Sequence, residues 1–151
     1  MKQTNNKGMT LIELLVVVVI LGILATIAVI GFGTIIEQSK DRAFVANAYT
    51  FKEAAEKYYL SSGSFTTEIN SDPFTYELLV GSGFLELFKD PYTNNMMPLN
   101  GFDSQVSIVR ENGNLTYYIC YIGETRKLCE NDGTGIQFEN ISTDKIKSNS
   151  N

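Results

Sequence analysis

The chain has 151 residues, of which 44% are hydrophobic and 19% charged, and its formal net charge is −5. This length accommodates one domain with a hydrophobic core and excludes a large multidomain enzyme. The absence of histidine excludes a histidine-based catalytic triad and histidine metal ligands, and two cysteines are too few for a four-cysteine zinc site. No phosphate-binding loop or nucleophile-elbow motif is present, and the acidic balance provides no basic surface for nucleic acid.

The apolar residues are concentrated near the N-terminus. Residues 9–36 hold 21 apolar residues in 28 positions and a single charge, Glu13. The uncharged stretch 14–36 would span roughly 34 Å as a helix, which is enough to cross the hydrocarbon core of a bilayer. Lys2 and Lys7 precede this stretch and favour a cytoplasmic N-terminus. The sequence therefore predicts one membrane-spanning helix, with the bulk of the chain on the outer side.

Two simple interpretations of this segment fit poorly. A secretory signal peptide would have a shorter apolar run followed by a small-residue cleavage site, and no such site clearly follows. A plain signal anchor leaves Glu13 unexplained, because a carboxylate at the membrane edge of an apolar helix is costly. An acidic residue in such a position points to a functional partner.

The third interpretation rests on residues 7–17, which read KGMTLIELLVV. This segment closely resembles the N-terminal signature of type IV prepilins and pseudopilins. The resemblance implies that a leader of residues 1–8 is cleaved between Gly8 and Met9, and that the new N-terminus at Met9 is methylated. It also implies that Glu13 of one subunit neutralises the Met9 amine of a neighbour and sets the stagger between them, since opposite charges attract strongly in a low-dielectric medium.

The chain departs from this family at one position in the helix. Many members carry a proline where this sequence has Ile30, and that proline helps the helix to kink or melt in filaments. Gly22, Gly31 and Gly33 remain. They are compatible with local melting, because glycine weakens helices, and equally with close packing against other helices.

Residues 37–63 predict a helix of a different kind. Apolar side chains recur there at spacings of three and four residues, which places them on one face: Phe44, Ala48, Phe51, Ala55 and Tyr58. Gly63 is the expected C-terminal cap. We therefore predict one helix from about residue 10 to residue 61, of which 9–36 is the membrane and filament-core part and 37–63 the amphipathic part.

Residues 64–141 are expected to form a globular head. Residues 64–103 are rich in loops, with short helical stretches in 75–87 and a turn at 90–94. Four β-rich runs follow, at 104–110, 115–122, 128–130 and 136–141, and an Asn-Gly pair at 112–113 predicts a hairpin between the first two. We expect an α+β fold in which a sheet of three or four antiparallel strands packs on the second half of the helix, as in pilins. The tail 142–151 is polar and is expected to be loose.

The two cysteines lie nine positions apart. If 123–126 forms a hairpin loop, Ile122 pairs with Lys127 and Cys120 falls opposite Cys129. That register allows a cross-strand disulfide on the outer side of the membrane, whereas two free buried thiols are the alternative.

The acidic residues of the head raise the question of a calcium site. Five carboxylates are candidate ligands: Asp90, Asp103, Glu130, Asp132 and Asp144. The turn around Asp132 lacks the spacing of an EF-hand loop, so a solvated acidic turn is favoured and no metal or cofactor is expected.

The chain therefore resembles a structural subunit and not an enzyme. The resemblance implies a type IV pilus subunit for adhesion, motility or DNA uptake, which is processed by prepilin peptidase and methyltransferase. It would be anchored in the cytoplasmic membrane with the N-terminus inside. An inner-membrane assembly platform would then polymerise it, with itself and other pilins, into an extracellular pilus.

Two other functions remain open. The first alternative is a pseudopilin of a type II secretion or competence system, although the chain has no tryptophan and lacks the acidic C-terminal pattern common in major pseudopilins. The second is a membrane-anchored ectodomain that never polymerises. Loss of Lys2 and Lys7 with the leader changes the side-chain charge to −7, so nucleic acid is not expected to bind along a filament shaft.

Overall fold

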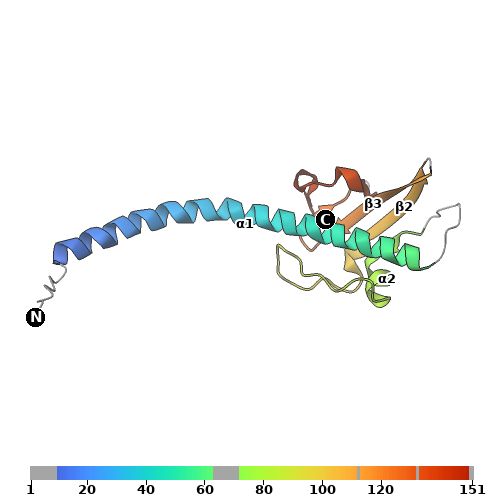
Figure 1. The fold of residues 1–151 in the computed structure, drawn as a ribbon, viewed down its shortest axis with the longest axis horizontal. Coiled ribbons are helices and arrows are strands. Elements are labelled where there is room, and N and C mark those ends of the chain that lie inside the picture. Colours follow the sequence, from blue (N-terminus) through green and yellow to red (C-terminus); the bar gives the residue numbers. More distant parts are fainter. Residues whose placement is uncertain (1–9, 63–71, 112, 132, 150–151) are drawn as a thin grey trace, which may run out of the picture. The chain divides into compact units, whose positions relative to one another are not determined.

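The computed structural model describes residues 10–62, 72–111, 113–131 and 133–149. The chain divides into two compact units, Met1–Gln38 and Ser39–Asn151, which are described separately. One continuous helix, α1 (Leu11–Ser61), contributes to both (Figure 1). This confirms the prediction of a single helix from about residue 10 to residue 61. The predicted cap Gly63 lies outside the described residues.

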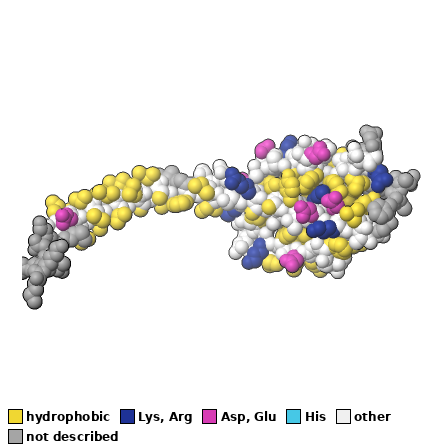
Figure 2. All heavy atoms as spheres, in the orientation of Figure 1, with side chains coloured by type: hydrophobic (Ala, Val, Ile, Leu, Met, Phe, Trp, Pro, Cys, Tyr) yellow, Lys and Arg dark blue, Asp and Glu magenta, His cyan; other side chains and the backbone are white. Residues whose placement is uncertain are grey.

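Within the described residues, the first unit consists of the N-terminal part of α1, whose surface is mainly apolar (Figure 2). Its described large apolar side chains are all exposed, from 46% at Val17 to 84% at Leu11. The segment is long and apolar enough to cross a membrane, and none of its most apolar window is buried. Water is a poor solvent for such a surface, which fits a helix that is anchored in a membrane.

In the second unit, α1 supplies one side of the hydrophobic core. Phe44, Ala48, Phe51 and Ala55 are fully buried, as the spacing of the stripe predicts. The fifth predicted member, Tyr58, is only half-buried. Two neighbouring residues that the stripe omits, Ala54 and Tyr59, are buried instead. The buried face is therefore wider than predicted, because the ring of Tyr76 packs on Phe51 and that of Phe74 on Tyr59.

A second helix, α2 (Tyr76–Gly81), follows a two-residue strand, β1 (Phe74–Thr75). The Thr75 side chain caps this helix by accepting a hydrogen bond from the Leu78 N–H at 3.2 Å. Past Ser82 the chain continues as loop, so the predicted helical stretches within 75–87 are reduced to this one helix.

The sheet is antiparallel and contains more strands than predicted. Its path is β1-β2-β3-β4-β6, and β5 pairs with β3 off that path. The additional strands have two residues each and join the sheet through backbone hydrogen bonds, which leaves little trace in side-chain patterning. The remaining strands are β2 (Gln105–Glu111), β3 (Asn114–Ile122), β4 (Arg126–Leu128), β5 (Ile136–Gln137) and β6 (Lys147–Ser148).

The predicted hairpin between β2 and β3 is confirmed. Glu111 pairs with Asn114, so the connection is the two-residue Asn-Gly loop. Gly113 has a φ of +87°, a conformation that glycine adopts without steric cost.

Two other expectations about the C-terminal half are wrong. The predicted strand 136–141 stops at Gln137, and the chain then forms a 3₁₀ helix, Phe138–Asn140. The described part of the tail, residues 142–149, is also not loose, because β6 pairs with β4 and the Asn149 N–H donates to the Thr125 carbonyl at 2.9 Å. Polar composition suggested a mobile tail, but its backbone joins the edge of the sheet.

Candidate functional site

The described part of the N-terminal site begins at Thr10, while Gly8 and Met9 lie outside the described residues. Helix α1 starts at Leu11, and the Leu14 N–H donates to the Thr10 carbonyl at 3.2 Å. Thr10 therefore occupies the N-cap position of the helix. Threonine favours this position because its side chain and backbone can bond locally at a helix end.

Glu13 reaches back to this cap. The Thr10 N–H donates to Glu13 Oε2 at 2.8 Å. A threonine followed three residues later by glutamate is the sequence pattern of a capping box, in which the glutamate satisfies the N-cap N–H. That N–H belongs to the peptide bond with Met9. The carboxylate is thus held one residue from the point at which the predicted cleavage would create an amine.

No cation is available to Glu13 within its own apolar segment. Residues 10–36 contain no lysine or arginine, and the next charged residue along the chain is Glu37. Local hydrogen bonds orient the Glu13 carboxylate but do not neutralise it. In apolar surroundings a carboxylate is costly unless it is protonated or paired with a cation, and such a cation would come from the N-terminus or from another chain.

Gly22 and Gly33 have no packing role among the described residues of the single chain. A Cβ added at Gly22 or Gly33 would meet nothing within 4 Å. The helix is continuous across both positions. Both roles considered from the sequence, local melting and close packing between helices, therefore concern an assembled state.

A disulfide joins β3 to the segment after β4. Ile122 pairs with Lys127, the register predicted from the sequence, and Cys120 is bonded to Cys129 with a Cα–Cα distance of 4.5 Å. Both cysteines are almost completely buried. The disulfide is therefore shielded from solvent, and it links β3 covalently to the segment that follows β4.

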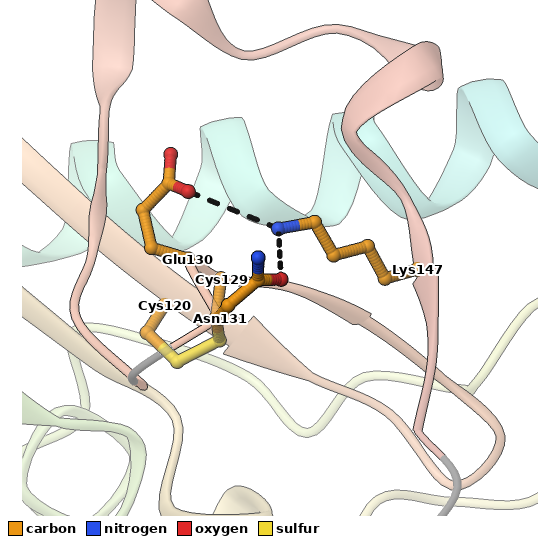
Figure 3. A network of polar contacts seen from close by, with 5 residues as sticks. All are labelled: Cys120, Cys129, Glu130, Asn131 and Lys147. Carbon is orange, nitrogen blue, oxygen red and sulfur yellow. Dashed lines mark hydrogen bonds and ion pairs between the residues drawn. A yellow bond between two sulfur atoms is a disulfide. The ribbon is translucent and has the colours of Figure 1, made fainter.

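Polar contacts next to the disulfide secure the last strand (Figure 3). Lys147 of β6 donates from Nζ to Asn131 Oδ1 at 2.9 Å and lies 3.8 Å from Glu130 Oε2. Both partners directly follow Cys129 in the sequence. The disulfide thus fixes the segment to which β6 is attached.

We expect the double substitution Cys120→Ala with Cys129→Ala to lower the free energy of unfolding of the head by about 2–3 kcal/mol, since the bond closes a short loop. Urea unfolding of the wild-type and variant chains in detergent measures this difference. Reductant should destabilise the wild type by a similar amount and leave the variant unchanged. Alkylation of both cysteines in the native, unreduced chain would instead show that the thiols are free.

Asp90 begins the turn predicted at 90–94, and its side chain makes the local bonds expected of such a turn. It is only 2% exposed, a burial that the sequence does not signal. Its Oδ1 accepts hydrogen bonds from the backbone N–H groups of Tyr92 at 2.8 Å and Thr93 at 3.3 Å, and its Oδ2 accepts one from the N–H of Glu124 at 2.8 Å. The carboxylate thus joins the 90–94 turn to the hairpin between β3 and β4.

These bonds occupy the Asp90 carboxylate with backbone donors. Within the described ranges, no group of three or more acidic or sulfur side chains could hold a metal ion, and Asp132 lies outside them. An aspartate before Pro-Tyr-Thr is a recognisable turn signal, because its side chain bonds the backbone two residues on. The third bond, to a residue 34 positions away, has no local signal.

Comparison with known proteins bears on the N-terminal segment. Residues 3–29 match the family model described as the prokaryotic N-terminal methylation motif. No significant match was found among curated proteins or solved structures. The matched range includes the Gly8–Met9 bond, the Thr10 cap and Glu13. The chain thus carries the N-terminal methylation motif, which is the signature of type IV pilins and pseudopilins.

Proposed function

We propose that this chain is a structural subunit of a type IV pilus. Prepilin peptidase cleaves it between Gly8 and Met9, the new amine at Met9 is methylated, and the mature chain polymerises through residues 9–36. The observation that carries this proposal is a helix with the methylation motif at its start and exposed apolar side chains along the first unit.

The helix serves two environments in turn. In the membrane, lipid covers the apolar side chains, and all backbone polar groups are satisfied within the helix. On assembly, an inner-membrane platform moves the helix from lipid into the filament, where copies of the same helix replace the lipid. Glu13 then pairs with the Met9 amine of a neighbouring copy, which neutralises two charges that would otherwise be costly in apolar surroundings.

The head remains on the outside of the filament. Its core is closed by α1, the sheet and the disulfide, independently of residues 9–36. We place the head beyond the outer face of the cytoplasmic membrane before assembly, consistent with Lys2 and Lys7 preceding the span. An oxidising environment there is also compatible with the disulfide.

Intact mass and N-terminal sequencing of the protein from its own cells test the processing steps. We expect a chain that starts at Met9. Compared with unmodified, reduced residues 9–151, one amine hydrogen should be replaced by a methyl group, and two hydrogens should be lost to the disulfide. Gly8→Val should block cleavage, and the leader should then remain attached. An unprocessed leader on the wild-type protein would contradict the proposal and favour a membrane-anchored ectodomain.

Imaging separates the pilus from its alternative. Long surface filaments that contain this chain, seen by electron microscopy with an antibody against the head, are the expected result. A pseudopilin would be identified by two results together. The leader would be cleaved normally without surface filaments, and deletion of the gene for this chain would stop protein export.

A further inference from the structure

A short ribbon in the head, residues 87–98, exposes an apolar surface. Lys89 and Met96 are paired in antiparallel fashion, and the Met97 N–H donates to the Phe88 carbonyl at 2.9 Å. Met97 is buried and Phe88 packs against the core. Because side chains alternate along such a ribbon, the neighbouring residues Leu87, Lys89 and Met96 face outward.

The outward side of this ribbon combines large apolar side chains with one charge, next to a polar tip at Asn94 and Asn95. Leu87 is 44% exposed and Met96 51%, and the following Leu99 is 53% exposed. Lys89 is exposed among them and makes no ion pair with any described residue. We call Leu87, Lys89, Met96 and Leu99 the ribbon face. A cluster of exposed apolar residues around a charge is typical of an interaction surface.

A groove of about 210 Å³ lies elsewhere in the head, and we call it the β3–β5 groove. Leu115, Tyr117 and Phe138 give it apolar walls, and Glu139 lies at its edge and is exposed. The residues that line it include Lys52, Leu115, Tyr117, Gln137, Phe138 and Glu139.

The Lys52 side chain in this groove is already paired within the chain. Its Nζ pairs with Glu56 and lies 4.2 Å from the centre of the Tyr117 ring. Burial and a hydrogen bond to Glu56 raise the pKa of Tyr117 to about 12, so its hydroxyl stays neutral at physiological pH. Glu139 has no ion pair among the described residues. The groove therefore offers apolar walls and one free negative charge.

The two surfaces lie on opposite flanks of α1. Asn47 donates from Nδ2 to the Lys89 carbonyl at 3.2 Å, whereas the Tyr49 ring packs on Phe138 with centroids 4.5 Å apart. Two residues of an α-helix correspond to about 200° of rotation, so Asn47 and Tyr49 point to opposite sides. Figure 1 shows the same arrangement within the head, with the yellow-green segment on one side of α1 and the red segment on the other.

We propose that the ribbon face of one subunit docks on the β3–β5 groove of the next copy of this chain in the filament. Met96 and Leu87 would cover the apolar walls, and Lys89 would pair with Glu139. The proposal rests on the proposed polymerisation and names the contact between heads. Two different surfaces on opposite flanks make a head-to-tail contact, which generates an open helical assembly instead of a closed dimer.

Charge exchange tests the predicted pair in the full chain. We expect Lys89→Glu to reduce surface filaments about tenfold, because like charges would then face each other across the contact. Adding Glu139→Lys to that variant should restore them. Lys57→Glu makes the same charge change at another exposed site of the head and should leave filament number unchanged. Equal loss in Lys89→Glu and Lys57→Glu, or no rescue by Glu139→Lys, would overturn the proposal.

Cross-linking tests the contact without relying on filament number. Both Met96 and Glu139 are exposed, so cysteines at these positions leave the core intact. In filaments of the variant with both Met96→Cys and Glu139→Cys, a short bismaleimide should produce a ladder of dimers, trimers and longer species. Either single variant should give no cross-link.

The outcomes distinguish this contact from polymerisation itself. Filaments that form but give no ladder would overturn the head contact and leave the pilus assignment intact. A dimer from Met96→Cys alone would show a symmetric ribbon-to-ribbon contact and would also overturn it. Wild-type chains that are processed but never form filaments would contradict the proposed pilus function, and the head contact with it.

Discussion

Glu13→Val should abolish filament formation while membrane insertion and leader cleavage continue. Valine suits the apolar helix, so the span is retained, but the carboxylate that would neutralise the Met9 amine of a neighbour is lost. An unpaired amine in apolar surroundings opposes close approach of subunits. Electron microscopy of cells should show no filaments, and membrane fractions should contain normal amounts of a chain that starts at Met9.

Glu53→Val is the matched control for this experiment. Glu53 is an exposed glutamate of the same helix, α1, but belongs to the head. Filaments should form normally in that variant, because its carboxylate lies outside the apolar segment. Normal filaments from the Glu13→Val variant would refute the assembly role of Glu13, and a variant missing from the membrane fraction would show that Glu13 acts on insertion instead.

Asp90→Ala should cause a larger loss of head stability than most other single changes in the chain. The substitution removes the acceptor of three backbone N–H groups, on Tyr92, Thr93 and Glu124, at a site that is only 2% exposed. We expect the unsatisfied donors to lower the free energy of unfolding by about 2–4 kcal/mol together. The loss is not larger because Glu124 is exposed, so water can reach part of the site. Urea unfolding of the full chain in detergent, followed by the fluorescence of its tyrosines, measures the change.

Two further variants define the cause. Asp90→Asn retains the side-chain oxygen for Tyr92 and Thr93 but turns an amide donor toward the Glu124 N–H, so it should cost about 1–2 kcal/mol. Glu86→Ala removes an exposed carboxylate near the same loop and should change stability by less than about 0.5 kcal/mol. If Asp90→Ala were as mild as Glu86→Ala, the Asp90 bonds would not stabilise the connection between the turn and the hairpin.

The elements that the sequence predicted well are those with local signals. The apolar run and the stripe at Phe44, Ala48 and Phe51 define α1 to within a residue at each end, because helix periodicity is read within a few turns. The Asn-Gly pair fixes the hairpin between β2 and β3, and the four-residue loop after Ile122 sets the pairing with Lys127. The capping box of Thr10 and Glu13 has an equally local spacing, but it was not predicted and was recognised only in the structure.

The elements predicted poorly depend on contacts between distant residues. β6 and the ordered tail exist because a polar segment reaches the edge of β4, which no hydropathy pattern signals. The burial of Asp90 depends on the hairpin that brings the Glu124 N–H over it. The ribbon face and the β3–β5 groove were missed for the same reason, since neither is contiguous in sequence.

The amino-acid sequence is enough to predict the membrane-compatible helix, the methylation motif at its start and the acid at position 13, because these arise from composition and spacing along one segment. Folding is needed to bury Asp90, to pair β6 with β4 and to create the surfaces on the two flanks of α1. Burial and surface shape depend on pairs of residues far apart in the chain. Folding brings such pairs together, and local propensity does not encode them.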